Sequence, residues 1–344
     1  MERLSQVGVG LIGAGRAGMV HARDFFTSIP EARMVAVFDA NAEAAAAAAS
    51  ELNATAYTDL DAFYANPDLD AVVIATPTFT HADHVVRAAH EKKAILCEKP
   101  VAISPEEVIR MEEALKATGV TFLMAFMRRF DDSFIRAREA IQNGEIGDVI
   151  LVKSTGKGPG LAPPWSWDIR KSNGVLAEVN SHDIDCIRWL TGREFEWVFA
   201  RGGNFRTPEL REDYPDYYDN VVMVAGLTGG VLSTVDGACP SEYGYDARVE
   251  IQGTEGVLFI GSVARPGLTV CTKKGVTAQT MNSWRNLFRE AYVAEDRHFI
   301  NCVLGREKPK TTLEDGARAL AVVRAGTRSL LSGKVETVDD WRAS

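Results

Sequence analysis

The sequence has little that would tie the chain to an oxidising compartment or to a membrane. Only five of its 344 residues are cysteines, and none of them forms a Cys-x-x-Cys pair or a zinc-like spacing. This favours a reducing cytoplasm and predicts no metal site. No apolar run reaches the roughly 18 residues that a membrane-spanning helix needs. The chain begins directly with a strand-like segment, so we expect no secretory signal peptide and no membrane partner.

Positive charge is also scarce. The chain has 38 Lys and Arg against 47 Asp and Glu, a net charge of −9, and it has no basic run, which argues against a nucleic-acid or anionic-membrane partner. With 46% hydrophobic and 25% charged residues, the composition excludes a disordered or fibrous chain. The length exceeds the size at which one core keeps growing, so we expect two domains and a small-molecule partner.

The first part of the chain alternates short apolar runs with amphipathic stretches. The runs are typical of buried parallel strands: Val7–Ile12, Met34–Phe38, Ala71–Ala75, Ala94–Cys97 and Phe122–Phe126. The stretches between them predict helices: Arg16–Thr27, Asn41–Leu52, His81–His90 and Pro105–Thr118, the last with Ser104 as its cap and Gly119 at its end. This alternation predicts a doubly wound parallel sheet of the Rossmann type over residues 1–127.

After residue 128 the pattern changes to strand-like segments joined by glycine-rich turns. These segments are Val149–Ser154, Trp197–Arg201, Asn220–Gly226, Val231–Val235, Arg248–Gln252 and Val257–Ile260. Helical patterns appear at Ser181–Leu190, Asn286–Leu304 and Leu313–Leu331. We therefore expect a second α/β domain with a mostly antiparallel sheet over residues 128–344. The last helices could also pack back on the first domain.

A glycine motif follows the first expected strand and opens the first expected helix. It reads Gly13-Ala14-Gly15-Arg16-Ala17-Gly18, and Asp39 stands 21 positions after Gly18. The first glycine permits a tight turn, the second lets the backbone approach a pyrophosphate, and the third allows close helix packing. The carboxylate of Asp39 accepts hydrogen bonds from ribose hydroxyls and repels a 2′-phosphate, so the sequence predicts NAD rather than NADP.

Four further features resemble one known family. They are Cys97-Glu98-Lys99-Pro100, Ala75-Thr76-Pro77 with His81, the stretch 173–185 that contains Glu178 and His182, and a tail with Glu314-Asp315-Gly316 and Ser329. Together these resemble the Gfo/Idh/MocA oxidoreductases. The resemblance implies a Rossmann domain and a C-terminal α/β domain with an open, mainly antiparallel sheet, which often makes oligomer contacts. A homodimer or homotetramer is therefore expected, as are cofactor contacts from Thr76, Pro77, His81, Glu98 and Lys99.

The resemblance also assigns the proton chemistry of an alcohol oxidation. A lysine at the carboxyl end of a parallel strand, such as Lys99, faces the crevice in which these sheets bind ligands, and the family implies a cis bond from Lys99 to Pro100. His182 begins a helix that Asn180 or Ser181 can cap, and an imidazole exchanges protons near neutral pH. Glu178 stands where the family has Asp, four residues before this His, and is expected to orient it or relay its proton. Which of Lys99 and His182 is the formal base stays open.

A tryptophan-rich loop is the candidate substrate contact. Trp165, Trp167, Asp168 and Arg170 resemble the family's Trp-x-x-Asp loop. Indole faces pack on sugar rings, and the charged pair could bind hydroxyls, while the alternative is that the aromatics only anchor the loop. Tyr243, Tyr245 and Arg128 are weaker candidates. His21 on the first helix fits helix packing as well as it fits a cofactor contact.

Three functions remain as hypotheses. The leading one is an NAD-dependent dehydrogenase that oxidises a secondary hydroxyl of a sugar, sugar derivative or cyclitol, with His182 taking the proton and Lys99 bonding the reacting oxygen. The second is an NAD-assisted glycoside hydrolase that recycles its cofactor internally. The third is a non-catalytic sugar or NAD sensor, which would need neither Lys99 nor His182.

Overall fold

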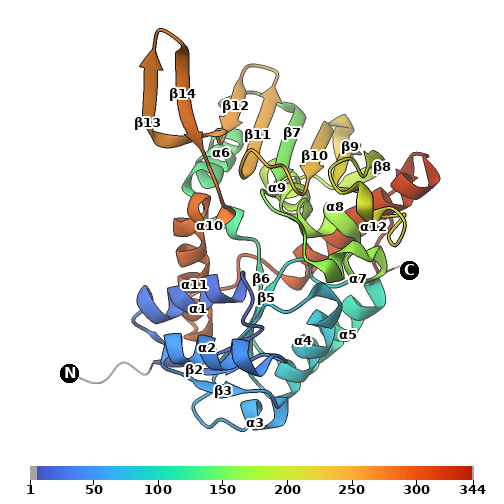
Figure 1. The fold of residues 1–344 in the computed structure, drawn as a ribbon. Helices are drawn as coiled ribbons and strands as arrows, with labels where there is room; N and C mark the ends of the chain where they lie inside the picture. Colours follow the sequence, from blue (N-terminus) through green and yellow to red (C-terminus); the bar gives the residue numbers. More distant parts are fainter. Residues whose placement is uncertain (1–5, 343–344) are drawn as a thin grey trace. The chain divides into compact units, whose positions relative to one another are not determined.

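The computed structural model describes residues 6–342, except for the side chains of residues 265–267. The chain divides into two compact units, drawn in Figure 1. Unit 1 holds the chain up to Phe130 together with Glu290–Ala317, and unit 2 holds Asp131–Arg289 together with the chain from Arg318 onward. Each unit is described by itself below. Among residues 6–342, no helix combines the length and apolarity required to cross a bilayer.

Unit 1 is built on a six-stranded parallel sheet with strand order β3-β2-β1-β4-β5-β6. The strands are β1 (Val7–Ile12), β2 (Ala32–Phe38), β3 (Thr55–Tyr57), β4 (Ala71–Ile74), β5 (Ala94–Glu98) and β6 (Phe122–Ala125). The helices are α1 (Gly18–Thr27), α2 (Ala42–Leu52), α3 (Leu60–Tyr64), α4 (His81–His90), α5 (Pro105–Thr118) and α11 (Arg289–Val303). The order reverses between β1 and β4, as in a dinucleotide-binding sheet. The predicted doubly wound sheet is confirmed, while β3 was not predicted because its three residues carry no buried apolar pattern.

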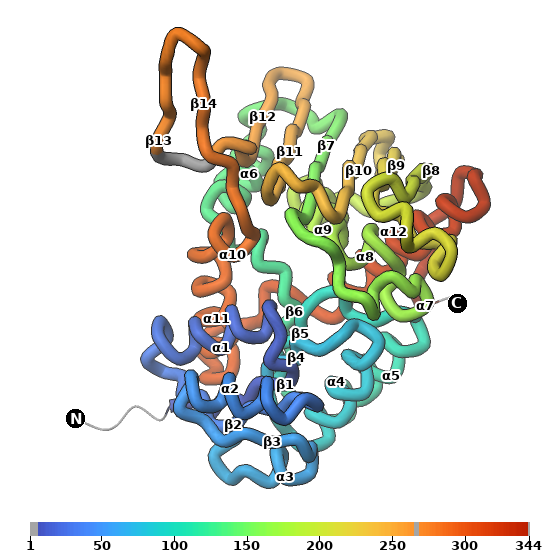
Figure 2. Tube along the Cα trace, viewed as in Figure 1, coloured from blue at the N-terminus to red at the C-terminus, as the bar shows by residue number. Residues whose placement is uncertain are grey.

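Local signals set the ends of these elements as expected. The Ser104 hydroxyl accepts the Glu107 N–H at the start of α5, and Gly119 ends that helix at φ +68°. The core beneath the sheet joins β1 and α1 to Phe299 and Ile300 of α11, which are 0% and 1% exposed. A helix from the far end of the sequence therefore completes the core of unit 1, and Figure 2 shows its orange tube beside the blue tube of α1.

Unit 2 contains a seven-stranded sheet with order β12-β11-β7-β10-β9-β8-β15. Its strands are β7 (Val149–Lys157), β8 (Phe195–Gly203), β9 (Asn220–Leu227), β10 (Leu232–Ala238), β11 (Asp246–Gly253), β12 (Val257–Ile260) and β15 (Glu336–Thr337). Every neighbouring pair is antiparallel except β7 and β10. The expected mainly antiparallel sheet is confirmed, with one parallel pairing that the sequence did not indicate.

Helices pack on one face of this sheet, with α8 and α9 against β7, β9 and β10. The helices of unit 2 are α6 (Asp132–Gln142), α7 (Ile169–Ser172), α8 (Gly174–Glu178), α9 (Ser181–Thr191), α10 (Trp284–Leu287) and most of α12 (Leu313–Ser332). The sequence did not predict α6, which Asp131 caps by accepting the N–H groups of Ser133 and Phe134. It also missed the hairpin of β13 (Ala264–Thr272) and β14 (Gly275–Thr280).

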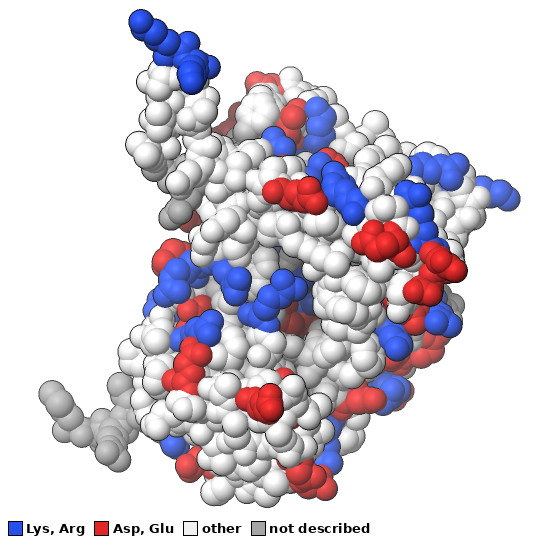
Figure 3. All heavy atoms as spheres, in the orientation of Figure 1, with Lys and Arg blue, Asp and Glu red and all other residues white. Residues whose placement is uncertain are grey.

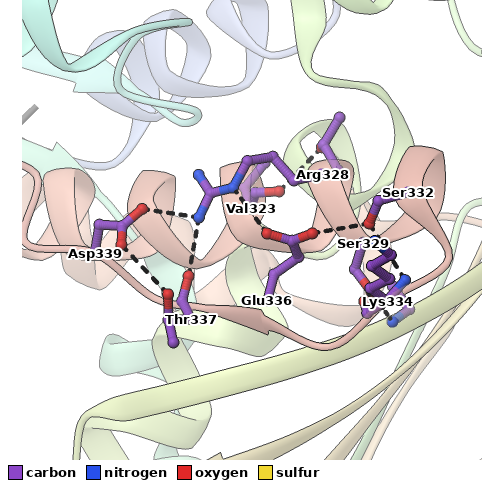
Figure 4. A network of polar contacts seen from close by, with 10 residues as sticks. Val323, Arg328, Ser329, Ser332, Lys334, Glu336, Thr337 and Asp339 are labelled. Atoms are coloured by element: carbon purple, nitrogen blue, oxygen red, sulfur yellow. Dashed lines mark hydrogen bonds and ion pairs between the residues drawn. The ribbon is translucent and has the colours of Figure 1, made fainter.

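A polar network fixes the end of α12 (Figure 4). The Arg328 guanidinium donates to the Thr337 carbonyl and to Asp339, both at 2.9 Å. Ser329 donates to the Lys334 carbonyl and accepts the Ala200 N–H of β8 at 2.9 Å. The tail serine singled out by the sequence therefore joins the last long helix to the sheet of unit 2.

Candidate active site

The glycine loop of unit 1 has the form that a dinucleotide requires. Gly13 adopts φ +99°, and an added Cβ would lie 2.8 Å from the Ala75 carbonyl oxygen. A Cβ on Gly18 would lie 2.1 Å from the Gly13 carbonyl oxygen, whereas a Cβ on Gly15 would meet nothing within 4 Å. Two glycines are thus demanded by the protein's own packing, and the middle one leaves open space at the backbone. That space fits a pyrophosphate beside the N-terminus of α1.

Arg16 and Ala17 lie in the turn of this loop, because α1 begins at Gly18 and not at Arg16 as predicted. Asp39 follows β2 and holds the loop from the side. Its carboxylate accepts the Ala14 N–H and the Asn41 N–H, each at 2.9 Å. The predicted ribose-binding acid is therefore fixed against the loop that would carry the phosphates.

His81, predicted as a cofactor contact, lies inside the protein. It is 1% exposed, with Nδ1 2.7 Å from the Pro100 carbonyl oxygen and Nε2 2.9 Å from the Thr76 carbonyl oxygen. A neutral ring donates one of these hydrogen bonds at a time, and burial lowers the pKa of His81. His81 thus links the segment that follows β4, which includes Thr76 and Pro77, to the segment that follows β5.

Lys99 comes directly after β5 and is half-buried. The Lys99–Pro100 peptide bond is cis, as the sequence resemblance implied. The Glu98 carboxylate accepts the Lys99 backbone N–H at 2.9 Å through Oε2. Because the carboxyl ends of parallel strands meet at one edge of a sheet, the glycine loop, Asp39, Thr76 and Lys99 share the edge at which these folds bind their cofactors.

In unit 2, Glu178 ends α8 and His182 is the second residue of α9. His182 is 7% exposed and Glu178 is half-buried. The prediction that Asn180 or Ser181 caps the helix is wrong, because Asn180 occupies the N-cap position but makes no capping hydrogen bond with its side chain. Its amide donates instead to Asp183 Oδ2 at 2.8 Å, because the Asp183 carboxylate is buried close by and needs donors.

Two glycines make room for this network. Ser154 of β7 donates to Asp183 Oδ1 at 2.6 Å. A Cβ on Gly237 of β10 would lie 1.9 Å from Asn180 Oδ1, and a Cβ on Gly156 of β7 would lie 2.1 Å from Asp183 Oδ2. The start of the helix that carries His182 therefore rests directly on two glycine positions of the sheet.

The tryptophan loop forms a short 3-10 turn, Pro164–Trp167, in front of α7. The Trp167 indole donates to the Ala162 carbonyl at 3.0 Å and meets the Tyr214 ring edge-on at 5.8 Å. These contacts fit the anchoring interpretation for Trp167, while Trp165 is half-buried. Asp168 and Arg170 form a two-bond ion pair at 2.8 and 2.9 Å, and hydrogen bonding from Arg170 lowers the pKa of Asp168. A substrate hydroxyl would have to compete with this pair.

The weaker candidates are engaged within the protein. The Tyr243 hydroxyl donates to Asp246 at 2.7 Å, and Tyr245 and Arg128 are buried. Over residues 6–342, no group of three or more His, Cys, Asp and Glu side chains is arranged to hold a metal.

Sequence reasoning missed the acids around His21. Glu295 and Asp296 of α11 are both 0% exposed, and Asp296 bonds His21 at 2.6 Å. Their spacing from Tyr292 and Phe299 puts them on the apolar face of the helix, which is the signal that could have found them.

Comparison with known proteins agrees with this arrangement. Residues 7–126 match a family described as an oxidoreductase family with an NAD-binding Rossmann fold, and residues 134–259 match the GFO/IDH/MocA C-terminal domain. The chain belongs to the Gfo/Idh/MocA oxidoreductase family. It is an NAD-binding oxidoreductase of the class that acts on CH–OH groups.

Among the relatives of this Gfo/Idh/MocA protein is a scyllo-inositol 2-dehydrogenase (NAD(+)) of Bacillus subtilis, 35% identical over 98% of both chains. An inositol 2-dehydrogenase of Rhizobium meliloti is also 35% identical, over 93% of this chain and 96% of that protein. A crystal structure of scyllo-inositol dehydrogenase from Lactobacillus casei with bound NAD(H) and scyllo-inositol has a TM-score of 0.89. It is 26% identical and covers 97% of this chain and 99% of that one.

Proposed function

We propose that this oxidoreductase is an inositol dehydrogenase, which oxidises one secondary ring hydroxyl of a cyclitol to a ketone. The observation that carries the proposal is the shared sheet edge in unit 1, where an open glycine loop, a fixed Asp39 and Lys99 lie together. The names of the relatives supply the substrate class.

The chain's own residues divide the chemistry as follows. When bound, NAD⁺ supplies the two-electron acceptor for the oxidation. The glycine loop of residues 13–18 and Asp39 hold it, with Thr76 and Pro77 nearby on the same edge. Residues 1–127 thus serve the cofactor and residues 128–344 serve the substrate.

The proton of the hydroxyl goes to His182, and Glu178 orients the imidazole or passes the proton on. The Lys99 ammonium donates a hydrogen bond to the same oxygen and stabilises the negative charge that develops on it. Trp165 and Trp167 provide apolar surface for the ring, and Asp168 with Arg170 binds its hydroxyls when their ion pair opens.

Purified protein with NAD or NADP and a panel of inositols, aldoses, glycosides and sugar acids tests the proposal. NADH absorbance should rise with at least one inositol and with NAD rather than NADP. No net NADH, together with solvent deuterium entering a glycoside ring, would instead indicate the hydrolase with internally recycled cofactor. NAD binding with no reaction on any compound would indicate the sensor.

We also propose that the chain assembles as a homodimer or homotetramer in the cytoplasm. The face of the seven-stranded sheet opposite α8 and α9 exposes Val222, Val224 and Leu232, each by 38% or more, which is unusual for a monomer surface. Figure 3 shows a basic tip on the β13–β14 hairpin, and Leu268 of the hairpin is 71% exposed. The molar mass measured by light scattering should be a multiple of the 37.5 kDa of one chain. The Val224→Lys variant should have a lower molar mass than the wild-type assembly.

A further inference from the structure

Four ionisable side chains form a closed cluster inside unit 1. They are His21 of α1, Glu98 of β5, and Glu295 and Asp296 of α11, with exposures of 0, 6, 0 and 0%. The Tyr292 ring closes one side, edge-on to His21 at 5.3 Å. No step proposed above for the oxidation uses His21, Glu295 or Asp296. Burying ionisable groups costs desolvation free energy unless they are paired and hydrogen-bonded.

Both nitrogens of His21 face a carboxylate. Nδ1 lies 2.6 Å from Asp296 Oδ1, and Nε2 lies 3.2 Å from Glu98 Oε1. A neutral imidazole donates through one nitrogen only and would turn a lone pair toward the other carboxylate. The imidazolium form donates to both carboxylates at once.

The charges of the cluster agree with this form. Burial opposes a charged His21, but Asp296 and Glu98 together raise its pKa well above the usual value. Burial also opposes ionisation of Glu98, yet His21 and Lys99 lower its pKa. Burial raises the pKa of Glu295 well above its usual range. Burial also raises the pKa of Asp296, although the charge and hydrogen bond of His21 act against that shift.

The Glu98 carboxylate connects the cluster to the backbone of Lys99. While Oε1 bonds His21, Oε2 accepts the Lys99 N–H at 2.9 Å. On the C-terminal side of Lys99, the carbonyl oxygen of Pro100 lies 2.7 Å from His81 Nδ1. The backbone on both sides of Lys99 is thus held by buried side chains, and the restraint on the amide side depends on how the Glu98 carboxylate is oriented.

We propose that His21 and Asp296 are positioning residues for the oxidation: they hold the Glu98 carboxylate in the orientation that accepts the Lys99 N–H and so fix Lys99 for its contact with the reacting oxygen. This inference rests on the proposed dehydrogenase function. The role proposed here differs from that of Asp39 and the glycine loop, which do not belong to the cluster.

The test compares Asp296→Asn and His21→Gln with His298→Gln. His298 is the matched control because it also lies on α11, is 4% exposed, and bonds Glu307 at 2.7 Å. We expect the first two variants to lower kcat with the best inositol by about tenfold or more, because small misplacements of a catalytic group are costly. Their NAD dissociation constants should stay within twofold of wild type, and the pH profile of kcat should shift. His298→Gln should lose stability but keep kcat and its pH profile.

Selective ¹⁵N-histidine NMR of the wild-type protein provides a second measurement that needs no variant to be active. The His21 ring should remain protonated at pH 7, and a neutral ring would overturn the proposal. An unchanged kcat and pH profile in folded Asp296→Asn, or an equal loss in His298→Gln, would also overturn it. Wild-type protein that forms no NADH with any inositol refutes the proposed function first and this inference with it.

Discussion

The two units support their proposed proton-handling residues in different ways. In unit 1, Lys99 follows Glu98, one of two carboxyl groups within hydrogen-bond distance of the buried His21 ring. In unit 2, the helix turn that carries His182 is held by an amide and a hydroxyl that donate to one buried carboxylate, Asp183. We expect the first arrangement to depend on the protonation of His21, and the second on the room that the glycines of the sheet leave for Asn180 and Asp183. Variants that change charge should therefore affect unit 1 most, and variants that change volume should affect unit 2 most.

Removal of the Lys99 ammonium should have the largest effect. Lys99→Met retains most of the side-chain volume and removes the donor to the reacting oxygen, so kcat should fall by about 10²–10⁴-fold. Calorimetric titration should show NAD binding unchanged, because the glycine loop and Asp39 are intact. Turnover at the wild-type rate would show that unit 1 contributes only cofactor binding.

The next variant tests whether the network below His182 needs a glycine at position 237. Gly237→Ala places a Cβ 1.9 Å from Asn180 Oδ1, so we expect a loss of about 1–3 kcal/mol in the free energy of unfolding and a kcat lowered by about tenfold or more. Urea unfolding and steady-state kinetics measure both quantities.

This variant has a matched control and a matched rescue. A Cβ on Gly160 meets no atom within 4 Å, so Gly160→Ala should behave as wild type. The three atoms nearest to the Gly237 Cβ belong to Asn180, so adding Asn180→Gly should recover the part of the stability that the clash costs, but not the hydrogen bond from Asn180 to Asp183. If the double variant is no more stable than Gly237→Ala, the contact between Gly237 and Asn180 is not the cause.

A change in cofactor preference is expected at the cofactor edge. Asp39→Asn removes the charge that repels a 2′-phosphate and weakens the bonds to Ala14 and Asn41, which lie at 2.9 Å. The ratio of kcat/KM for NAD to that for NADP should fall by about tenfold to a hundredfold, the range of about 1.5–3 kcal/mol for a charged hydrogen bond. Asp59→Asn is the control, since Asp59 caps α3 by accepting the Ala62 N–H. An equal change in the ratio of kcat/KM for NAD to that for NADP in both variants would show that Asp39 does not select the cofactor.

The contrast between the units also explains what the sequence could and could not predict. Strands β1 and β12 begin and end at the predicted residues, because a short apolar run between turn residues favours a strand whether it is buried throughout, as β1 is, or largely exposed, as β12 is. The glycine motif and Asp39 were predictable because the reason for each residue is local. Strand β3 was not predictable, since its three residues show no buried apolar pattern. Helix α6 was missed although its sequence carries local signals, namely the cap Asp131 and the buried Phe134 and Ala137 three residues apart.

The supporting residues of the candidate site were harder to predict, because their partners are distant in sequence. His21 and Asp296 are 275 positions apart, and Ser154 and Asp183 are 29 apart. The sequence predicted Asn180 or Ser181 as the helix cap, but the Asn180 oxygen accepts no backbone N–H of the helix and its amide NH2 donates to the buried Asp183 carboxylate. The family resemblance therefore indicated Lys99 and His182 as candidates, while the groups that orient the surrounding backbone became visible only through tertiary contacts.

The smallest expected effect is a difference in how stability depends on pH. The pKa of His21 is raised on folding, so its stabilising contribution is fully present below the unfolded pKa of about 6.5 and is lost as pH rises through the folded pKa. Urea unfolding between pH 6 and 9 should show wild type losing stability relative to His21→Gln, with a slope difference of at most about 1.4 kcal/mol per pH unit. His298→Gln should run parallel to wild type above pH 7, because burial lowers the pKa of His298 and confines its contribution to pH values below about 6.5. Parallel curves for wild type and His21→Gln above pH 7 would mean that unit 1, like unit 2, is held by contacts that do not depend on a proton.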